Sequence, residues 1–275
     1  MTIKQVENIQ IQKIVSGNRI TTDDQVAIEE PLEIRLRYSS ATGEIQKNIS
    51  VTMRTPGNDD ELAAGFIFTE GIIKNHEAIR EIKSSSDQNS ILVVLKQDVY
   101  PELKNIGRNF YSTSSCGICG KASIDSIRIS SPFYGNTDNL VINATVFNSL
   151  QSNLENQQII FKNTGGIHAC ILFDQNGNLL LLREDVGRHN ALDKIIGASL
   201  INGEIPLDNC ILFLSGRSSF ELIQKAVMAG IKIIASVGAP SSLAIELAKE
   251  AGITLIGFLR SDRFNIYSGN HRIAV

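Results

Sequence analysis

The chain has 275 residues, with 26 Lys and Arg against 29 Asp and Glu and a net charge of −3. This length favours about two domains, and 43% hydrophobic with 20% charged residues excludes disorder for most of the chain. The slightly acidic balance argues against broad nucleic-acid or anionic-membrane binding. No apolar run is long enough to span a membrane, and residues 1–15 lack the apolar core of a secretory signal. We therefore expect a cytoplasmic protein with no nucleic acid and no membrane as partners.

The first half predicts a hairpin, a helix and a further strand. Apolar and polar residues alternate over 34–38 and 49–53, on either side of Ala41-Thr42-Gly43, which is typical of a β-hairpin. A helix is expected from Asp59, where acidic residues lie at the positive end of the helix dipole, and 91–95 form a short buried strand. Strand pairs with one helix make residues 1–142 an α+β N-terminal domain that ends in a cysteine-bearing loop. The buried side of the helix is formed by Leu62, Phe66, Ile67 and Ile73.

The second half alternates strands and helices. A helix is expected over 144–159, and two strands within 170–182 flank the turn Asp174-Gln175-Asn176-Gly177. Asn190 is the expected cap of a helix over 190–200, and Ser218-Ser219-Phe220-Glu221 matches a capping box that begins another helix. Residues 143–275 therefore predict an α/β C-terminal domain with a largely parallel sheet. The other predicted elements are strands over 211–214, 231–235 and 253–258 and a helix over 243–251.

A loop over 101–135 carries Cys116-Gly117-Ile118-Cys119-Gly120-Lys121. Flanking glycines leave the sulfur uncovered, and Lys121 favours the thiolate, which is the reactive form of cysteine. Three interpretations remain open on these residues. The pair supplies two ligands of a zinc site, with His168 and Cys170 as further candidates; it forms a thioredoxin-like redox disulfide; or one cysteine carries sulfur as a persulfide.

The segment Gly165-Gly166-Ile167-His168-Ala169-Cys170 partly matches the H-x-E sequence of zinc deaminases. In those enzymes the Glu transfers protons and a later P-C-x-x-C completes the zinc site. Here Cys170 replaces the Glu and no P-C-x-x-C follows. We therefore favour a His168 that lines the core or a pocket and binds no metal.

Two predicted strand-to-helix loops, over 184–190 and 215–218, indicate one site for a phosphate-bearing ligand. Ligands bind beyond the carboxyl ends of strands in open α/β sheets, and a helix N-terminus with Gly and Arg suits an anion. The same Ser, Gly and Asn residues are equally good helix caps. The arginines of Phe258-Leu259-Arg260-Ser261-Asp262-Arg263 either clamp phosphate and a guanine-like edge or lie in a solvated turn.

Several motifs occur together in one order along the chain. With them the chain closely resembles the formate dehydrogenase accessory sulfurtransferase family (FdhD/NarQ), from about residue 22 to residue 273, and the block around Val186 is the most specific part. The motifs are Arg54-Thr55-Pro56-Gly57, Glu61 to Phe66, Ser115 to Gly120, Gly166-Ile167-His168, Arg183 to Lys194, Ser215-Gly216-Arg217 and Arg260 to Asn265.

The resemblance implies a cytoplasmic sulfur carrier, a sulfurtransferase required for formate dehydrogenase activity. A cysteine desulfurase passes sulfur to Cys116 as a persulfide, Cys119 is the second cysteine of the motif, and the sulfur goes to Mo-bis(molybdopterin guanine dinucleotide) before that cofactor enters formate dehydrogenase. The cofactor-binding residues map to Phe258, Leu259, Arg260, Ser261, Asp262 and Arg263, to which we add Arg217. The resemblance also implies a homodimer and a C-terminal domain similar to the cytidine deaminase fold, without its zinc site.

GDP is the expected surrogate ligand, because it represents half of that cofactor. Two alternatives remain open. One is a zinc-dependent hydrolase on a deaminase-like scaffold, with zinc held by Cys116, Cys119 and His168. The other is a chaperone that binds and delivers the cofactor without moving sulfur.

Overall fold

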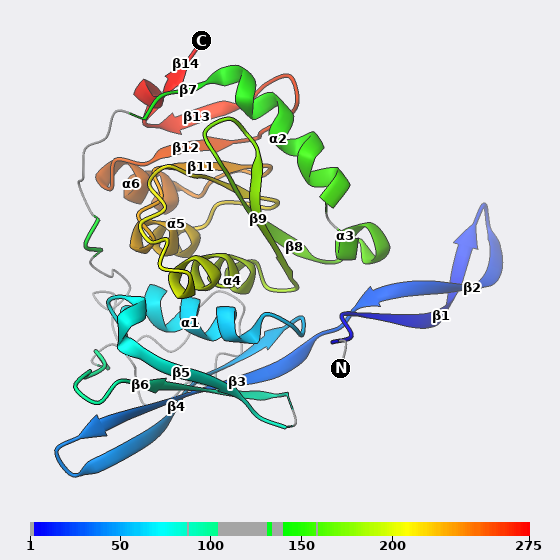
Figure 1. Ribbon diagram of the computed structural model, residues 1–275. Helices are drawn as coiled ribbons and strands as arrows, with labels where there is room; N and C mark the ends of the chain where they lie inside the picture. The colour runs from blue at the N-terminus through cyan, green and yellow to red at the C-terminus, as the bar shows by residue number, and fades with distance from the viewer. Residues whose placement is uncertain (1–2, 87, 104–130, 134–139, 158) are drawn as a thin grey trace.

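The structure is a computed structural model that describes residues 3–86, 88–103, 131–133, 140–157 and 159–275, with the backbone alone described at 151–157 and 159. Figure 1 shows two sheets, one from each half of the chain, with two helices packed between them and a β-ribbon that projects to one side. No helix in the described ranges is long and apolar enough to cross a membrane.

The predicted hairpin and helix of the first half are confirmed. Strand β3 (Glu30–Ser40) pairs antiparallel with β4 (Gly43–Arg54), and helix α1 (Asp59–Thr69) follows. Strand β6 (Ser90–Leu95) pairs parallel with β3, and β5 (Ile79–Ser84), which the sequence analysis did not predict, completes a sheet in the order β4-β3-β6-β5. Helix α1 covers one face of this sheet (Figure 1). A 3-10 turn, η1 (His76–Ala78), leads into β5.

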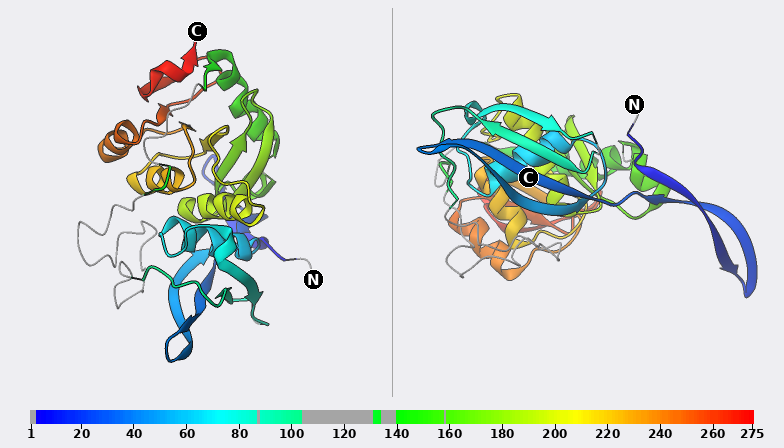
Figure 2. Two further views of the ribbon diagram at one scale, coloured as in Figure 1. Left: turned by 60° about the vertical axis from the view of Figure 1, so that its left-hand side comes forward. Right: turned by 90° about the horizontal axis from the view of Figure 1, so that it is seen from below.

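Strands β1 (Val6–Val15) and β2 (Asn18–Ala27) form a separate two-stranded antiparallel sheet. This ribbon, which we call the arm, projects from the body in both views that show its length (Figures 1 and 2). The sequence analysis predicted no element here, because the apolar residues of these strands are widely spaced among polar ones.

The second half is built on a six-stranded sheet in the order β13-β12-β11-β10-β8-β9. The predicted parallel arrangement is correct for β10, β11 and β12 alone, because β8 pairs antiparallel with β10 and β9, and β13 pairs antiparallel with β12. The sheet is therefore mixed. Its strands are β8 (His168–Phe173), β9 (Leu179–Asp185), β10 (Ile211–Leu214), β11 (Ile233–Ser236), β12 (Thr254–Gly257) and β13 (Asn265–Ser268).

Helices cover both faces of this sheet. On one face, α4 (Arg188–Ile201), α5 (Phe220–Met228) and α6 (Ser242–Glu250) bury residues such as Leu212, Ile234 and Leu255. The same apolar cluster continues through α1 to the first sheet, so one core joins the two halves. On the other face, α2 (Ala144–Gln157) contributes Phe147 and Leu150 to a second cluster.

The helix expected over 144–159 is confirmed over 144–157 by α2; residue 158 lies outside the described residues, and α3 (Ile159–Thr164) follows. Two predicted helix starts are wrong. Helix α4 begins at Arg188 with Gly187 as its cap, so Asn190 is not a cap. Helix α5 begins at Phe220 with Ser219 as its cap, which shifts the frame by one residue and removes the predicted capping box.

Helices α1 and α4 cross with their backbones in contact. A Cβ atom added at Gly65 would lie 1.9 Å from the carbonyl oxygen of Asp193, and one added at Gly197 would lie 1.8 Å from that of Glu61. Real atoms do not approach so closely, so only glycine fits at either position. This crossing holds the two sheets at a fixed separation.

The end of the chain returns to the start of the second half. Strand β14 (Ile273–Ala274), which follows the 3-10 turn η3 (Asn270–Arg272), pairs parallel with β7 (Ile142–Asn143). The boundary predicted between residues 142 and 143 therefore lies within a strand.

Candidate cofactor-binding site

The candidate site lies along one edge of the six-stranded sheet. Strands β9, β10, β11 and β12 run in the same direction, so their carboxyl ends share this edge. Helices α4, α5 and α6 begin just after β9, β10 and β11 respectively. Three helix N-termini, each with partial positive charge, thus line the edge where open α/β sheets bind their ligands.

The loops that leave β10, β11 and β12 are bonded to one another. The backbone N–H of Gly238 donates to the carbonyl of Gly216 (2.9 Å), and that of Phe258 donates to the carbonyl of Gly238 (3.2 Å). A Cβ at Gly238 would lie 2.8 Å from Cγ of Arg217. Because Gly238 has no side chain, Arg217 can lie next to the loop that begins at Phe258. The structure thus places Arg217 and the 258–263 segment, both predicted to bind the cofactor, side by side.

Arg260 ties two of these loops together. Its Nη1 donates to the carbonyl oxygens of Val237 (3.0 Å) and Leu259 (2.6 Å), and its backbone N–H donates to the carbonyl of Arg263 (2.9 Å). A guanidinium has five donors. Arg260 therefore fixes the shape of the edge, and these two side-chain bonds use only Nη1 of its guanidinium.

Arg217 and Arg263 differ from Arg260 in their exposure. Both are exposed, and the Arg263 side chain retains 74% of its accessible surface beside Asp262 (3.3 Å). Exposed guanidinium groups near helix N-termini suit a phosphate, which they bind with paired hydrogen bonds. Ser261 is exposed as well.

 The backbone of Phe258 has φ of 53° in the left-handed region, which is rare and unfavourable for a bulky residue. Such a conformation persists only where the surroundings hold it, and it is common at binding sites. As a result the Phe258 side chain is 44% exposed at the edge, whereas Leu259 is fully buried beneath it.

His168 lies at the same edge. It begins β8, which runs antiparallel to β10, and a Cβ added at Gly216 would lie 3.4 Å from its Nδ1. Partial burial, followed by the charge of Arg188, lowers the pKa of His168, so its ring is neutral at pH 7. This position agrees with the favoured interpretation of His168 as a lining residue.

Sequence reasoning missed a second histidine at the edge. His189, in the first turn of α4, has Nε2 3.5 Å from Oγ of Ser219 and 4.0 Å from a carboxylate oxygen of Glu221. Both of these residues lie at the start of α5. The two strand-to-helix junctions were the available signal, because helices that follow strands running in the same direction begin at the same edge of the sheet.

Several side chains of the block 183–194, which includes the predicted ligand loop, make packing contacts within the protein. Arg183 forms a two-pronged ion pair with Glu61 of α1 (2.5 and 2.6 Å). Glu184 accepts the backbone N–H groups of Ile160 and Phe161 at the start of α3 (3.1 and 3.0 Å). These carboxylates are therefore used in packing.

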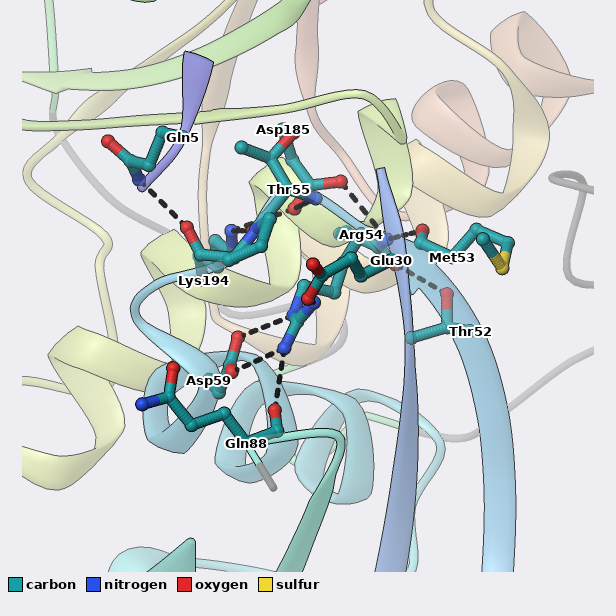
Figure 3. Close-up of polar contacts among 12 residues, drawn as sticks. Gln5, Glu30, Thr52, Met53, Arg54, Thr55, Asp59, Gln88, Asp185 and Lys194 are labelled. Carbon is teal, nitrogen blue, oxygen red and sulfur yellow. Dashed lines mark hydrogen bonds and ion pairs between the residues drawn. The ribbon is translucent and has the colours of Figure 1, made fainter. Parts of the chain in front are cut away.

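Asp185 is fully buried where the two halves meet (Figure 3). Its Oδ2 lies 2.7 Å from Nζ of Lys194 and accepts the backbone N–H of Thr55 (3.2 Å). Lys194 also donates to the carbonyl of Thr55 (2.9 Å), and Asn190 donates to Oδ1 of Asp185 and to the carbonyl of Met53. Burial raises the pKa of Asp185, and the Lys194 ammonium opposes that change.

A second buried cation lies on the other side of this junction. The guanidinium of Arg54, which has no exposed side-chain surface, donates to both carboxylate oxygens of Asp59 (2.9 Å each) and to the carbonyl of Gln88 (2.8 Å), as Figure 3 shows. The Arg54-Thr55-Pro56-Gly57 motif and the block 183–194 are thus partners in one polar junction.

A third buried group joins α1, α4 and α5. Nζ of Lys225 lies 2.9 Å from Asp193 and 2.8 Å from Oγ1 of Thr69, with Glu70 at 3.5 Å. Burial raises the pKa of Asp193 to about 6, against the opposing effect of Lys225. Burial alone would lower the pKa of Lys225, but the charges of Asp193 and Glu70 outweigh it and raise that pKa.

The cysteines divide into two groups. Cys116 and Cys119, with Lys121, lie outside the described residues. Cys170 is buried in the core, and burial raises the pKa of its thiol, so its suggested part in a zinc site is not supported. Burial likewise raises the pKa of Cys210 to about 11. The described part of the chain holds no group of three His, Cys, Asp or Glu side chains placed to bind a metal.

Comparisons with known proteins agree on one family. The model of the FdhD/NarQ family matches residues 27–274. A relative from Mycolicibacterium paratuberculosis named "Sulfur carrier protein FdhD" is 44% identical, with 96% of this chain and 97% of the relative covered. One of the same name from Sulfolobus acidocaldarius is 40% identical, over 98% and 99% of the two chains.

A solved structure gives the same result. A crystal structure from Desulfotalea psychrophila, described as that of a formate dehydrogenase accessory protein, is 28% identical and has a TM-score of 0.75, with 98% of this chain and 100% of that chain covered. The family model spans well over half of the chain, and the relatives match it almost end to end. The chain therefore belongs to the FdhD/NarQ family.

Proposed function

We propose that this protein is a sulfur carrier required for formate dehydrogenase activity, and that it works as a sulfurtransferase through a persulfide on Cys116. One observation carries the proposal: relatives named as sulfur carriers match the chain over almost its whole length at 40–44% identity. The Cys116-Gly117-Ile118-Cys119 motif supplies a thiol pair in a glycine-rich sequence, which suits an exposed, reactive thiolate.

The proposed first step is a transfer of sulfane sulfur. The thiolate of Cys116 attacks the outer sulfur of a cysteine desulfurase persulfide, a new S–S bond forms, and the desulfurase sulfur leaves as its own thiolate. No electrons are gained or lost overall. Cys119 is the second thiol of the motif, three residues after Cys116.

The proposed acceptor of the sulfur is Mo-bis(molybdopterin guanine dinucleotide), bound as a substrate before its insertion into formate dehydrogenase. Its anionic phosphates suit the exposed guanidinium groups of Arg217 and Arg263 and the three helix N-termini at the same edge. Arg260 shapes the loop, and Phe258 offers an exposed ring for stacking on a base. Leu259, Ser261 and Asp262 complete the proposed binding segment.

Four broader expectations accompany this proposal. The protein acts in the cytoplasm, it forms a homodimer, and its two functional units divide at residues 142 and 143. The C-terminal unit is proposed to be similar to the cytidine deaminase fold, which the mixed sheet with helices on both faces supports.

Persulfide mapping tests the proposal. The protein is incubated with a cysteine desulfurase and cysteine, and its peptides are analysed by mass spectrometry. We expect one added sulfur atom on the Cys116 peptide and its loss in Cys116→Ser, whereas Cys210→Ser serves as a matched control and retains it. An unmodified Cys116 in the wild type, or stoichiometric zinc held by Cys116, Cys119 and His168, would contradict the proposal and favour a zinc-dependent hydrolase.

A further inference from the structure

His168 lies at the same edge as the segment 258–263 but on a different strand. Strand β8, which begins at His168, is separated from β12 by β10 and β11 in the order of the sheet. At the usual spacing of neighbouring strands, three steps make roughly 14 Å. An extended nucleoside diphosphate is long enough to bridge such a span. A nucleotide whose base lies near Phe258 can therefore direct its phosphates along the edge towards β8.

The ring of His168 lies against the loop that carries Arg217. The backbone N–H of Ala169 donates to Oγ of Ser215 (2.9 Å), and that of Ser215 donates to the carbonyl of Ala169 (3.0 Å). These two bonds hold the start of β8 beside the end of β10. A Cβ added at Gly216 would lie 3.4 Å from Nδ1 and 3.6 Å from Cε1 of His168. The imidazole is thus next to the residue that precedes Arg217.

Two charged groups act on the ring of His168. Arg188 is the first residue of α4, and Asp185 is the partner of His168 in the pairing of β8 with β9. Burial and the Arg188 charge lower the pKa of His168, and the Asp185 carboxylate opposes them. Among the described residues, neither ring nitrogen of His168 has a hydrogen-bond partner. A phosphate at this position would therefore meet a neutral ring that can still accept a proton.

We propose that His168 binds the second phosphate of the guanine nucleotide, the one further from the guanosine, and takes up a proton as it does so. This inference rests on the proposed function, because it places the nucleotide at the same edge. One ring nitrogen accepts a proton from the buffer, the ring becomes a cation, and its N–H donates to a phosphate oxygen. No bond of the nucleotide breaks. A neighbouring anion favours the charged imidazole, and a charge-assisted hydrogen bond is stronger than a neutral one.

The proposal makes His168 a specificity residue for the diphosphate. Its removal is expected to affect the second phosphate and to leave the contacts of the guanine and of the first phosphate in place. In His168→Ala, the dissociation constant of GDP is expected to rise about tenfold or more, which is the scale of a charged hydrogen bond. The constant of GMP, which lacks the second phosphate, stays within about twofold of its wild-type value.

Titration calorimetry of the full chain with GDP and GMP tests the proposal. Measurements near pH 7 in buffers of different ionisation enthalpy give the number of protons taken up with GDP. His168→Gln keeps an N–H donor but cannot be protonated, so we expect it to retain part of the affinity. The wild type is expected to take up more protons than His168→Gln, by up to about one per GDP, since protons on the phosphate itself are common to both.

His271→Gln is the matched control. His271 is exposed, and its neighbour Arg272 donates to the carbonyl of Gly252 (2.8 Å) and to Oγ1 of Thr254 (3.2 Å), at the amino end of β12. This histidine therefore lies at the opposite edge of the sheet. Its replacement is expected to change neither the affinity for GDP nor the proton uptake.

Two results would overturn the proposal while GDP still binds. Equal effects of His168→Ala on GDP and GMP would show that the second phosphate lies elsewhere. Equal proton uptake by the wild type and His168→Gln would show that no proton binds at His168. Either result leaves the proposed function in place. A wild type that binds no GDP would instead remove this edge as the cofactor site, and the proposal for His168 with it.

Discussion

At the scale of single residues, Asp193 is a buried carboxyl group whose pKa in the folded protein, about 6, exceeds its ordinary value of 3.8. The folded state then holds a proton that the unfolded state has released between about pH 4 and 6. The contribution of Asp193 to the free energy of unfolding is therefore complete below pH 4. It is lost as the pH rises through 6, with a slope of at most about 1.4 kcal/mol per pH unit. Urea unfolding of the wild type and Asp193→Asn across this range checks the prediction. Equal pH slopes in the two proteins would contradict it.

Also at this scale, Arg260 and Arg263 are expected to respond differently to removal. Arg263→Ala deletes an exposed cation, so GDP binding weakens by about 1.5–3 kcal/mol with unfolding unchanged. Arg260→Ala weakens GDP binding and also destabilises the fold by about 1–2 kcal/mol, because two hydrogen bonds to loop carbonyls are lost. Calorimetry and urea unfolding separate the two effects, with the exposed Arg80→Ala as control. Unchanged affinity in both variants would remove this edge from the proposed site.

At the scale of elements, the crossing of α1 and α4 depends on two glycines. Gly197→Ala places a methyl group 1.8 Å from the carbonyl oxygen of Glu61, so the helices must separate. We expect a net loss of about 1–3 kcal/mol in unfolding free energy, although alanine is the better helix former. Asn148→Ala on the exposed side of α2 is the control and is expected to be neutral or stabilising. A Gly197→Ala protein as stable as the wild type would show that the crossing is not tight.

Periodic elements were predictable and long-range partnerships were not. The alternation in β3 and β4, the acidic start of α1 and the Asp174 to Gly177 turn all act within a few residues, and the structure confirms each. The sequence predicts a ligand loop over 184–190. Asp and Asn are equally suited to helix caps, ligand sites and buried polar junctions, so the residue types alone do not distinguish these roles. Only the fold reveals that Asp185 meets Thr55, 130 positions earlier. The arm could not be predicted, because the apolar residues of β1 and β2 are spaced among polar ones.

At the scale of the whole molecule, one core and a buried polar junction unite the two halves, and the exposed arginines lie on the edge of the second sheet. The sequence predicts that Arg217 and the segment 258–263 meet at this edge, since parallel strands place their following loops at one edge of the sheet; the structure confirms this position, and the binding of a cofactor there stays a prediction. In the proposed function, this edge holds a large anionic substrate while Cys116 supplies the sulfur.

The most direct test of the account follows one sulfur atom. Cys116 is loaded with isotopically heavy sulfur from a desulfurase, excess donor is removed, and formate dehydrogenase lacking this sulfur is added together with its molybdenum cofactor. We predict that the heavy label leaves the Cys116 peptide and appears in the enzyme in equal amount as formate oxidation begins. Full activation by Cys116→Ser under the same conditions, or activation while the label stays on Cys116, would contradict the account.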